Sequence, residues 1–118
     1  MLSLFPALAA CIAVLEAEGL VETRKSVDDY LTDLSETVWE GTSIRDLLDM
    51  TSGVDALDET PGAMTDVNHP NYRYESSLGN LGDYASCQDT FHVVKSLKRC
   101  ARAGTVYQYA SANTIVLG

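Results

Sequence analysis

Tyr109 and Ser111 stand two residues apart near the end of the chain. They follow a Gly-containing turn at residues 103–105 and precede an apolar run at residues 112–117, so both lie at the expected entrance of a helix. A phenol can carry a proton, and a nearby hydroxyl can donate a hydrogen bond that tunes it. An unperturbed phenol titrates at a pKa of about 10, so it acts as a base only where a cation or metal favours the phenolate. The pair therefore predicts a proton-transfer site whose cation comes from elsewhere.

Structural interpretations compete with this one. Tyr109 could equally be a half-buried tyrosine at a helix entrance, and Ser111 could be the N-cap of a helix that begins at Ala112. Ser52 lies in a helix-ending Ser-Gly turn with no base nearby, so it is not a nucleophile candidate.

Residues 54–87 are predicted to form a long irregular segment, because Gly, Pro, Asn, Asp and Ser recur throughout. Such segments in compact domains are usually functional. Tyr72 and Tyr74 are therefore candidate substrate-binding residues. In the alternative interpretation, this is an ordinary surface loop whose tyrosines pack on the domain.

The first helix is predicted over 6–18. Pro6 suits a first turn, Gly19 suits the residue that follows a helix, and nearly every position up to Leu15 is apolar. Such a helix should be buried on most sides. Because 118 residues can scarcely supply so many neighbours, the pattern indicates a fragment.

Further helices are predicted over 44–51, over 88–102 and from near Ser111. Ser43 and Asp46 have the spacing of a capping box, and Gly53 marks the stop. In 88–102, basic residues in the second half match the helix dipole, which explains them without a ligand: Lys95, Lys98, Arg99 and Arg102. Upstream, Ser26 should cap a short helix at 27–31, and Trp39 should anchor a loop in the core.

The composition disfavours several classes of binding partner. The net charge is −9, which disfavours nucleic acid and anionic membranes because both would be repelled. No apolar run reaches the length of a membrane span, no Cys/His spacing resembles a zinc site, and no glycine-rich phosphate loop predicts a cofactor. The odd set of three cysteines is read as buried small hydrophobes in a reducing compartment, which favours the cytoplasm, although a Cys87–Cys100 disulfide stays open.

The N-terminus imitates a secretory signal, and Leu8–Cys11 imitates a lipoprotein cleavage site. No Lys or Arg precedes the apolar run, and Pro6 interrupts it. We interpret it as a core helix and rank a small secreted lipoprotein last among the hypotheses.

Three stretches together resemble the serine β-lactamase-like hydrolases, which include class C β-lactamases, penicillin-binding esterases and 6-aminohexanoate-dimer hydrolases. Residues 18–31 begin with EGL and end with VDDYL, residues 42–54 read TSIRDLLDMTSGV, and residues 103–111 read AGTVYQYAS. Their order and spacing follow the family over nearly the whole chain, with Ala103 in place of the usual Pro. The sequence LLDMTSGVD at residues 47–55 and the sequence of residues 75–80 are most similar to the amide-hydrolase branch of the family.

The resemblance implies that Tyr109 is the catalytic tyrosine, sharing a proton network with a nucleophilic Ser and a Lys and helping to protonate the leaving group. Ser111 would help to hold the substrate or the Lys. Segment 54–87, with Tyr72 and Tyr74, would lie beside Tyr109 as a wall of the substrate site. The substrate would be a small amide, ester or lactam.

The chain departs from the family at the nucleophile. The motif Ser-x-x-Lys should open the first helix, but Ser3 is followed three residues later by Pro6. The sheet that backs the site and the late Lys/His-x-Gly strand also have no counterpart. We therefore expect a mainly α chain that is the helical lobe of a β-lactamase/transpeptidase-like α+β fold, truncated at both ends. Residues 1–118 would be one partial domain.

Two hypotheses follow. In the first, the chain is a piece of a serine hydrolase that works through an acyl-enzyme, inactive alone and prone to self-association through exposed apolar surface. In the second, it is a non-catalytic homologue or truncated remnant with a binding or structural role. A Ser-x-x-Lys motif in frame upstream of Met1 would favour the first.

Overall fold

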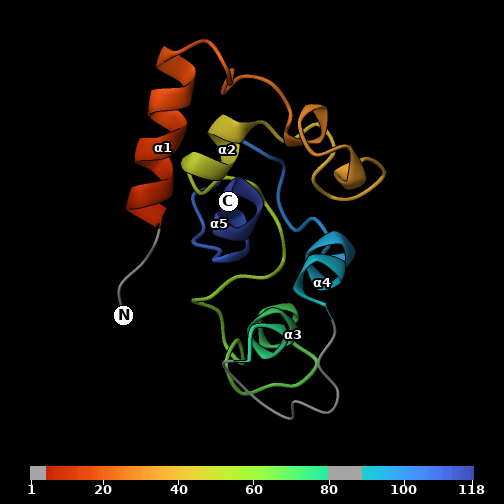
Figure 1. Cartoon of the computed structure of the whole chain (residues 1–118). Coiled ribbons are helices and arrows are strands. Elements are labelled where there is room, and N and C mark those ends of the chain that lie inside the picture. The colour runs from red at the N-terminus through yellow and green to blue at the C-terminus, as the bar shows by residue number, and fades with distance from the viewer. Residues whose placement is uncertain (1–4, 80–88) are drawn as a thin grey trace.

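The fold is mainly helical (Figure 1). The computed structural model describes residues 5–79 and 89–118. The elements are α1 (Phe5–Ala17), the 3₁₀ turns η1 (Val27–Asp29) and η2 (Thr32–Leu34), α2 (Ile44–Leu48), α3 (Pro70–Ser77), α4 (Thr90–Ser96) and α5 (Ala112–Leu117). Over these two ranges extended pairing is limited to isolated bridges, Ser26 with Ser43 and Val54 with Arg99. The predicted mainly α class is confirmed.

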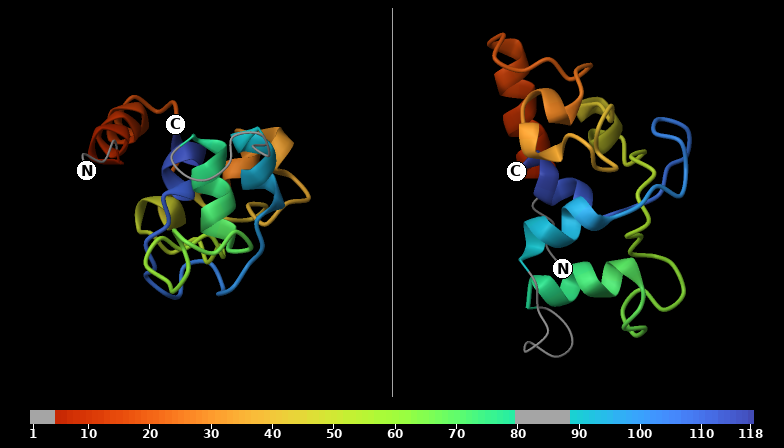
Figure 2. Two further views of the ribbon diagram at one scale, coloured as in Figure 1. Left: turned by 90° about the horizontal axis from the view of Figure 1, so that it is seen from below. Right: turned by 90° about the vertical axis from the view of Figure 1, so that its right-hand side faces the viewer.

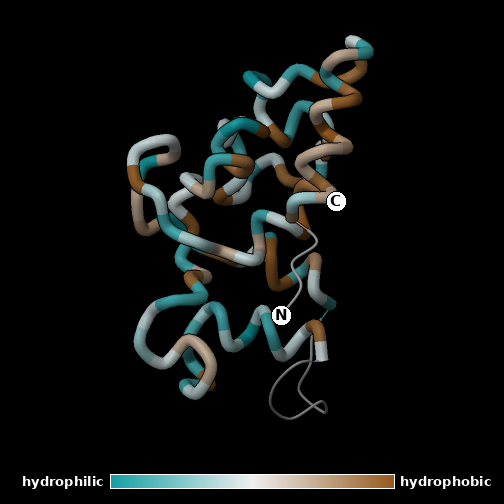
Figure 3. The backbone as a smooth tube through the Cα atoms, turned by 90° about the vertical axis from the view of Figure 1, so that its left-hand side faces the viewer, coloured by the Kyte–Doolittle hydropathy of each residue, from teal (hydrophilic) through white to brown (hydrophobic). Residues whose placement is uncertain are grey.

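Helix α1 ends as its sequence predicts. Gly19 has a φ of 77°, and the Leu20 amide donates to the Leu15 carbonyl at 2.9 Å. The expected burial on most sides is wrong, because no residue of α1 is buried. Figure 1 shows the reason: the helix lies at the edge of the molecule and meets the rest along one side, near α5. The helix is nevertheless largely hydrophobic, as its tan and brown colour in Figure 3 shows. Ile12 packs against the core from this helix.

The core is one cluster of buried side chains from α2, α3, α4, α5 and the two 3₁₀ turns, and α5 lies between α1 and α4 in both views of Figure 2. Trp39 is completely buried, and its indole Nε1 donates to the Val94 carbonyl at 3.0 Å. This confirms that Trp39 anchors its loop. Leu47 from α2 and Val116 from α5 are buried in the same cluster, so both helices contribute to one hydrophobic core.

Helix α2 begins with the predicted capping box. The Asp46 amide donates to Ser43 Oγ at 3.0 Å, and the Ser43 amide donates to Asp46 Oδ2 at 3.2 Å. Ser26 also precedes a helical turn, as predicted, but it makes no side-chain cap bond; its hydroxyl donates instead to Asp28. The predicted cap by Ser26 is therefore wrong.

Helix α4 is shorter than predicted. It ends at Ser96, and residues 97–102 run alongside residues 53–55, where the Cys100 amide donates to the Gly53 carbonyl at 2.7 Å. The dipole explanation is therefore wrong for Lys98, Arg99 and Arg102, which lie beyond the end of the helix, and it applies only to Lys95. Arg99 instead joins two loops. Its guanidinium donates to the Ser52 carbonyl at 2.7 Å and to Thr42 Oγ1 at 2.9 Å, tying two loops together.

Helix α3 interrupts the segment predicted to be irregular, so that prediction is wrong for residues 70–77. Pro70 opens the helix, and the Asn71 amide donates to Nδ1 of the N-cap residue His69 at 3.0 Å. Histidine is not among the usual N-cap residues, which hides this start from a sequence pattern. The end of the segment, with Tyr84 and Cys87, lies outside the described residues.

Two cysteines differ from expectation. Cys11 and Cys100 are exposed free thiols, so the prediction that they are buried is wrong. Cys87, the other half of the conceivable disulfide, lies outside the described residues. Among the helices that the structure describes, none is long and apolar enough to cross a membrane.

Candidate active site

The segment from Tyr109 to Ser111 leads directly into α5, which begins at Ala112 as predicted. Ser111 occupies the N-cap position, but its side chain makes no cap bond. The hydrogen-bond partner of the Ser111 hydroxyl lies far away in sequence, on the loop that follows residues 54–57.

Asp58 is that partner. Its Oδ1 accepts from the Ser111 amide at 2.8 Å, and its Oδ2 accepts from the Ser111 hydroxyl at 2.5 Å. Its own amide donates to the Tyr109 carbonyl at 3.3 Å. One half-buried aspartate therefore holds the backbone on both sides of Ala110 and the Ser111 hydroxyl.

Tyr74 supports the same segment from α3. Its side chain is 2% exposed, and its hydroxyl donates to the Ser111 carbonyl at 3.2 Å. Tyr72 is half-buried and lies two residues earlier on the helix, so the two side chains face different directions. The structure therefore brings Tyr74, and not Tyr72, into hydrogen-bonding contact with the Ser111 segment. Of the segment 54–87, residues 57–60 lie beside Tyr109, because they line the same cavity or bond to its backbone.

Burial raises the pKa of Tyr74 above the ordinary value for tyrosine, and the negative charges of Glu75 and Asp58 add to the shift. A phenol that stays neutral in the folded chain but ionises near pH 10 once unfolded stabilises the fold fully below that pH. Stability should fall as the pH rises above about 10, by at most about 1.4 kcal/mol per pH unit from this group. Denaturant unfolding at pH 9, 10 and 11 measures the slope, and Tyr74→Phe should flatten it. An unchanged slope in Tyr74→Phe would assign the alkaline loss to other groups.

A buried polar contact holds α5 against the turn after α2. The Ser52 hydroxyl donates to Asn113 Oδ1 at 2.7 Å, and both side chains are at most 2% exposed. Beside it, the Gln108 amide donates to the Met50 carbonyl at 2.9 Å. The Ser52 proton thus goes to an amide oxygen rather than to a base, in agreement with the view that Ser52 is not a nucleophile.

The side chain of Tyr109 is half-buried and borders a small cavity of about 190 Å³. The other lining residues are Leu57, Glu59, Thr60, Tyr107 and Gln108. Within residues 5–79 and 89–118, the Tyr109 hydroxyl makes no hydrogen bond. Its proton-transfer role, and the substrate contacts of Ser111, Tyr72 and Tyr74, stay predictions.

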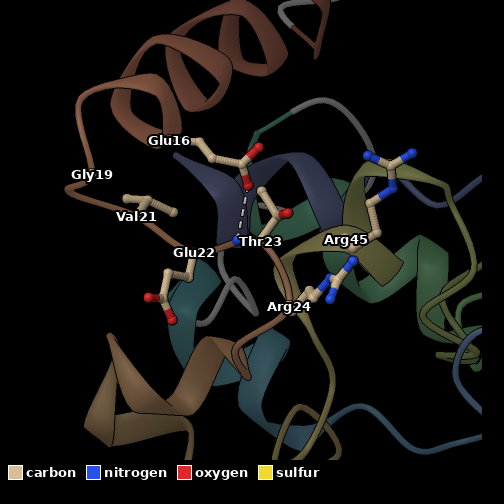
Figure 4. A pocket seen from close by; sticks show the side chains of 7 residues that line it. All are labelled: Glu16, Gly19, Val21, Glu22, Thr23, Arg24 and Arg45. Carbon is tan, nitrogen blue, oxygen red and sulfur yellow. Dashed lines mark hydrogen bonds between the residues drawn. The ribbon is translucent and has the colours of Figure 1, made fainter.

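A larger cleft of about 880 Å³ lies apart from these residues, between the end of α1 and the start of α2 (Figure 4). Its charges balance, with Glu16 and Glu22 against Arg24 and Arg45. Hydrogen bonds from Thr23 hold the pKa of Glu16 below its usual value, and the two arginines add to the effect. The cleft lies beside the turn that follows α1, and none of the predicted site residues line it.

Sequence reasoning missed Asp58, because its partner Ser111 is 53 residues away and nothing local marks the pairing. It also missed Asn113 as the partner of Ser52, across a separation of 61 residues. In the described part of the chain, no cluster of three or more His, Cys, Asp or Glu residues could hold a metal ion.

Comparison with known proteins identifies the family of the chain. A family model described as beta-lactamase matches residues 6–118. Among solved structures, a protein from Bacillus anthracis assigned as a 6-aminohexanoate-dimer hydrolase has the same fold over 93% of this chain, with a TM-score of 0.74 and 20% sequence identity. The chain covers 29% of that protein, so it corresponds to less than a third of the solved structure. The chain is therefore a member of the beta-lactamase family and matches part of a structure with that fold.

Proposed function

We propose that this chain supplies the tyrosine side of a serine hydrolase active site that cleaves amide, ester or β-lactam bonds through an acyl-enzyme. One observation carries the proposal: Asp58 and Tyr74 fix the Tyr109–Ser111 segment at the start of α5 by four hydrogen bonds. Family membership supports the class of chemistry, and small-molecule substrates are typical of it. The name of the Bacillus anthracis relative favours an amide bond.

In this proposal, the serine hydroxyl gives its proton to the network of the lysine and Tyr109 as its oxygen attacks the carbonyl carbon, and the bond to the leaving nitrogen or oxygen then breaks. Tyr109 passes a proton to that leaving atom, and Ser111 orients the substrate or the lysine that serves the nucleophile. Water then hydrolyses the acyl-enzyme. The nucleophile and the lysine come from a Ser-x-x-Lys motif, and these 118 residues contain none. We therefore expect the isolated chain to be inactive.

A chimera tests the proposal. Residues 6–118 would replace the matching segment of the Bacillus anthracis hydrolase, which supplies the remaining parts of the fold. Turnover of p-nitrophenyl acetate, nitrocefin and the 6-aminohexanoate dimer would be compared with the unsubstituted hydrolase. Turnover of any of them supports the proposal and identifies the bond type. A folded chimera without turnover would favour the alternative, a non-catalytic homologue or remnant with a binding or structural role.

Self-association of the isolated chain is the second part of the proposal. The observation behind it is α1, whose residues are apolar from Phe5 to Leu15 and nowhere buried. Beside it, an apolar groove of about 220 Å³ runs between α1, η1 and α5.

Val14→Glu should weaken this association, because it places a charge on the exposed apolar side of α1, where Val14 is 57% exposed. We expect the association constant from sedimentation velocity to fall at least about tenfold, the equivalent of about 1.4 kcal/mol. Val67→Glu is the matched control, since Val67 is 64% exposed but lies in the loop before α3. Equal weakening by both changes, or a monomeric wild-type chain, would count against an α1 interface.

A further inference from the structure

The Ser111 hydroxyl has one hydrogen to donate, and Asp58 takes it. The Oγ–Oδ2 distance is 2.5 Å, and the second carboxylate oxygen accepts from the amide of the same residue. The hydroxyl is the donor and Oδ2 the acceptor in this contact, so the hydroxyl hydrogen points at Asp58. With its hydrogen engaged, the hydroxyl keeps only lone pairs for any other partner.

Neighbouring hydrogen bonds hold the backbone of Ser111 in the position from which its hydroxyl donates to Asp58. The Ser111 carbonyl is occupied by the Tyr74 hydroxyl, and the Tyr109 carbonyl by the Asp58 amide. Moving the backbone of Ser111 away from Asp58 would therefore break contacts on both sides. Ser111 is only half-buried, and the next residue after Asp58 is the exposed acid Glu59, so the local charge is negative.

We propose that Asp58 makes Ser111 a dedicated hydrogen-bond acceptor, so that this end of the site selects ligand groups with an N–H donor, such as a secondary amide or an ammonium group, over groups that only accept. The inference rests on the proposed function in taking Ser111 as a ligand contact. It assigns Asp58 as a positioning residue, because Asp58 acts through Ser111. Secondary amides would then be preferred over tertiary amides and esters of the same shape.

The test uses two probes that differ in one donor, N-methylacetamide and N,N-dimethylacetamide. Both are titrated into the ¹⁵N-labelled 118-residue chain, and the movement of the Ser111 amide resonance gives the affinity. We expect the probe with the N–H group to bind roughly three- to tenfold more tightly, which is the usual net worth of one hydrogen bond. Equal affinities in the wild-type chain, or no movement of the Ser111 resonance with N-methylacetamide, would overturn the proposal.

Asp58→Asn should remove or reverse the preference. Its amide nitrogen can donate to Ser111 Oγ and release the hydroxyl hydrogen toward the ligand, while its oxygen still accepts from the Ser111 amide. Glu59→Gln is the matched control, because it neutralises the adjacent carboxylate without touching Ser111, and it should keep the preference. A preference that survives in Asp58→Asn, or that is lost in Glu59→Gln, contradicts the assignment.

Ser111→Ala covers the case in which Asp58→Asn does not fold. It removes the hydroxyl but leaves the backbone contact to Asp58, so the amide at position 111 should stay protected from hydrogen exchange while the probe preference disappears. Persistence of the preference without the hydroxyl would sink the proposal. Because these readouts measure binding alone, they are independent of turnover by the chimera: a silent chimera with intact probe selection would reject only the hydrolase function.

Discussion

Tyr109→Phe is expected to lower kcat of the chimera by roughly 10²- to 10⁴-fold, the range that a positioned acid–base group contributes. The change removes one oxygen and leaves a ring that still borders the cavity of about 190 Å³. Because the backbone of Tyr109 is held through its carbonyl by Asp58, the segment should keep its position. The loss should therefore appear in kcat, with KM little changed, as expected for a group that acts in the transition state.

Tyr107→Phe provides the control for this prediction. Tyr107 lines the same cavity and is 72% exposed, so the loss of its hydroxyl tests whether any phenol at this rim matters. We expect less than about a twofold change in kcat, because a solvated hydroxyl away from the reacting atoms contributes little. Equal effects of the two changes, or an effect of Tyr109→Phe on KM alone, would argue against proton transfer by Tyr109.

Gly53→Ala is expected to unfold most of the chain. A Cβ at this position would stand 1.9 Å from the Ala101 carbonyl oxygen, and the backbone φ of 77° is itself unfavourable for alanine. Relief of the clash requires residues 99–101 to move away, which breaks the bond from the Cys100 amide to the Gly53 carbonyl. We expect a loss of at least about 3 kcal/mol, a large part of the stability of a small domain.

Gly41→Ala separates backbone strain from the clash. Gly41 has a φ of 76° but no atom within 4 Å of the added Cβ, so only the strain of about 1–2 kcal/mol should appear. Urea unfolding followed by the fluorescence of Trp39, the only tryptophan and fully buried, reports both variants. Similar midpoints for the two variants would show that the contact of Gly53 with Ala101 is not tight in solution.

Local signals predicted several helix ends but not all of them, since α2 ends at Leu48 and not at the predicted stop near Gly53. The Ser43–Asp46 capping box and the turn at Gly19 formed as the sequence indicates, because their partners lie within a few residues. Helix α4 was overestimated for the opposite reason. Pairing of residues 97–102 with 53–55 competes with helical hydrogen bonds, and no local pattern reports that distant partner.

The candidate site likewise contains residues that the local sequence indicates and residues that only distant contacts reveal. The order of its motifs pointed to Tyr109 and Ser111, and the helix entrance lies where the sequence predicts. Asp58, which holds both residues, could not be found, because its role exists only after the loop and the helix meet. The burial of α1 was misjudged since apolar composition shows only that a helix needs neighbours, not that the chain supplies them.

Turnover by the isolated chain tests the central claim most directly. The purified 118-residue protein would be assayed with p-nitrophenyl acetate and nitrocefin, beside its Ser3→Ala and Tyr109→Phe variants. Groups of a catalytic site act as a unit, and the loss of a nucleophile alone costs on the order of 10⁶ in rate. We therefore predict background rates for all three proteins, because these 118 residues contain no Ser-x-x-Lys motif to serve the proposed tyrosine side of the site. Turnover well above background that Ser3→Ala abolishes would show that Ser3 is a nucleophile and would contradict the account.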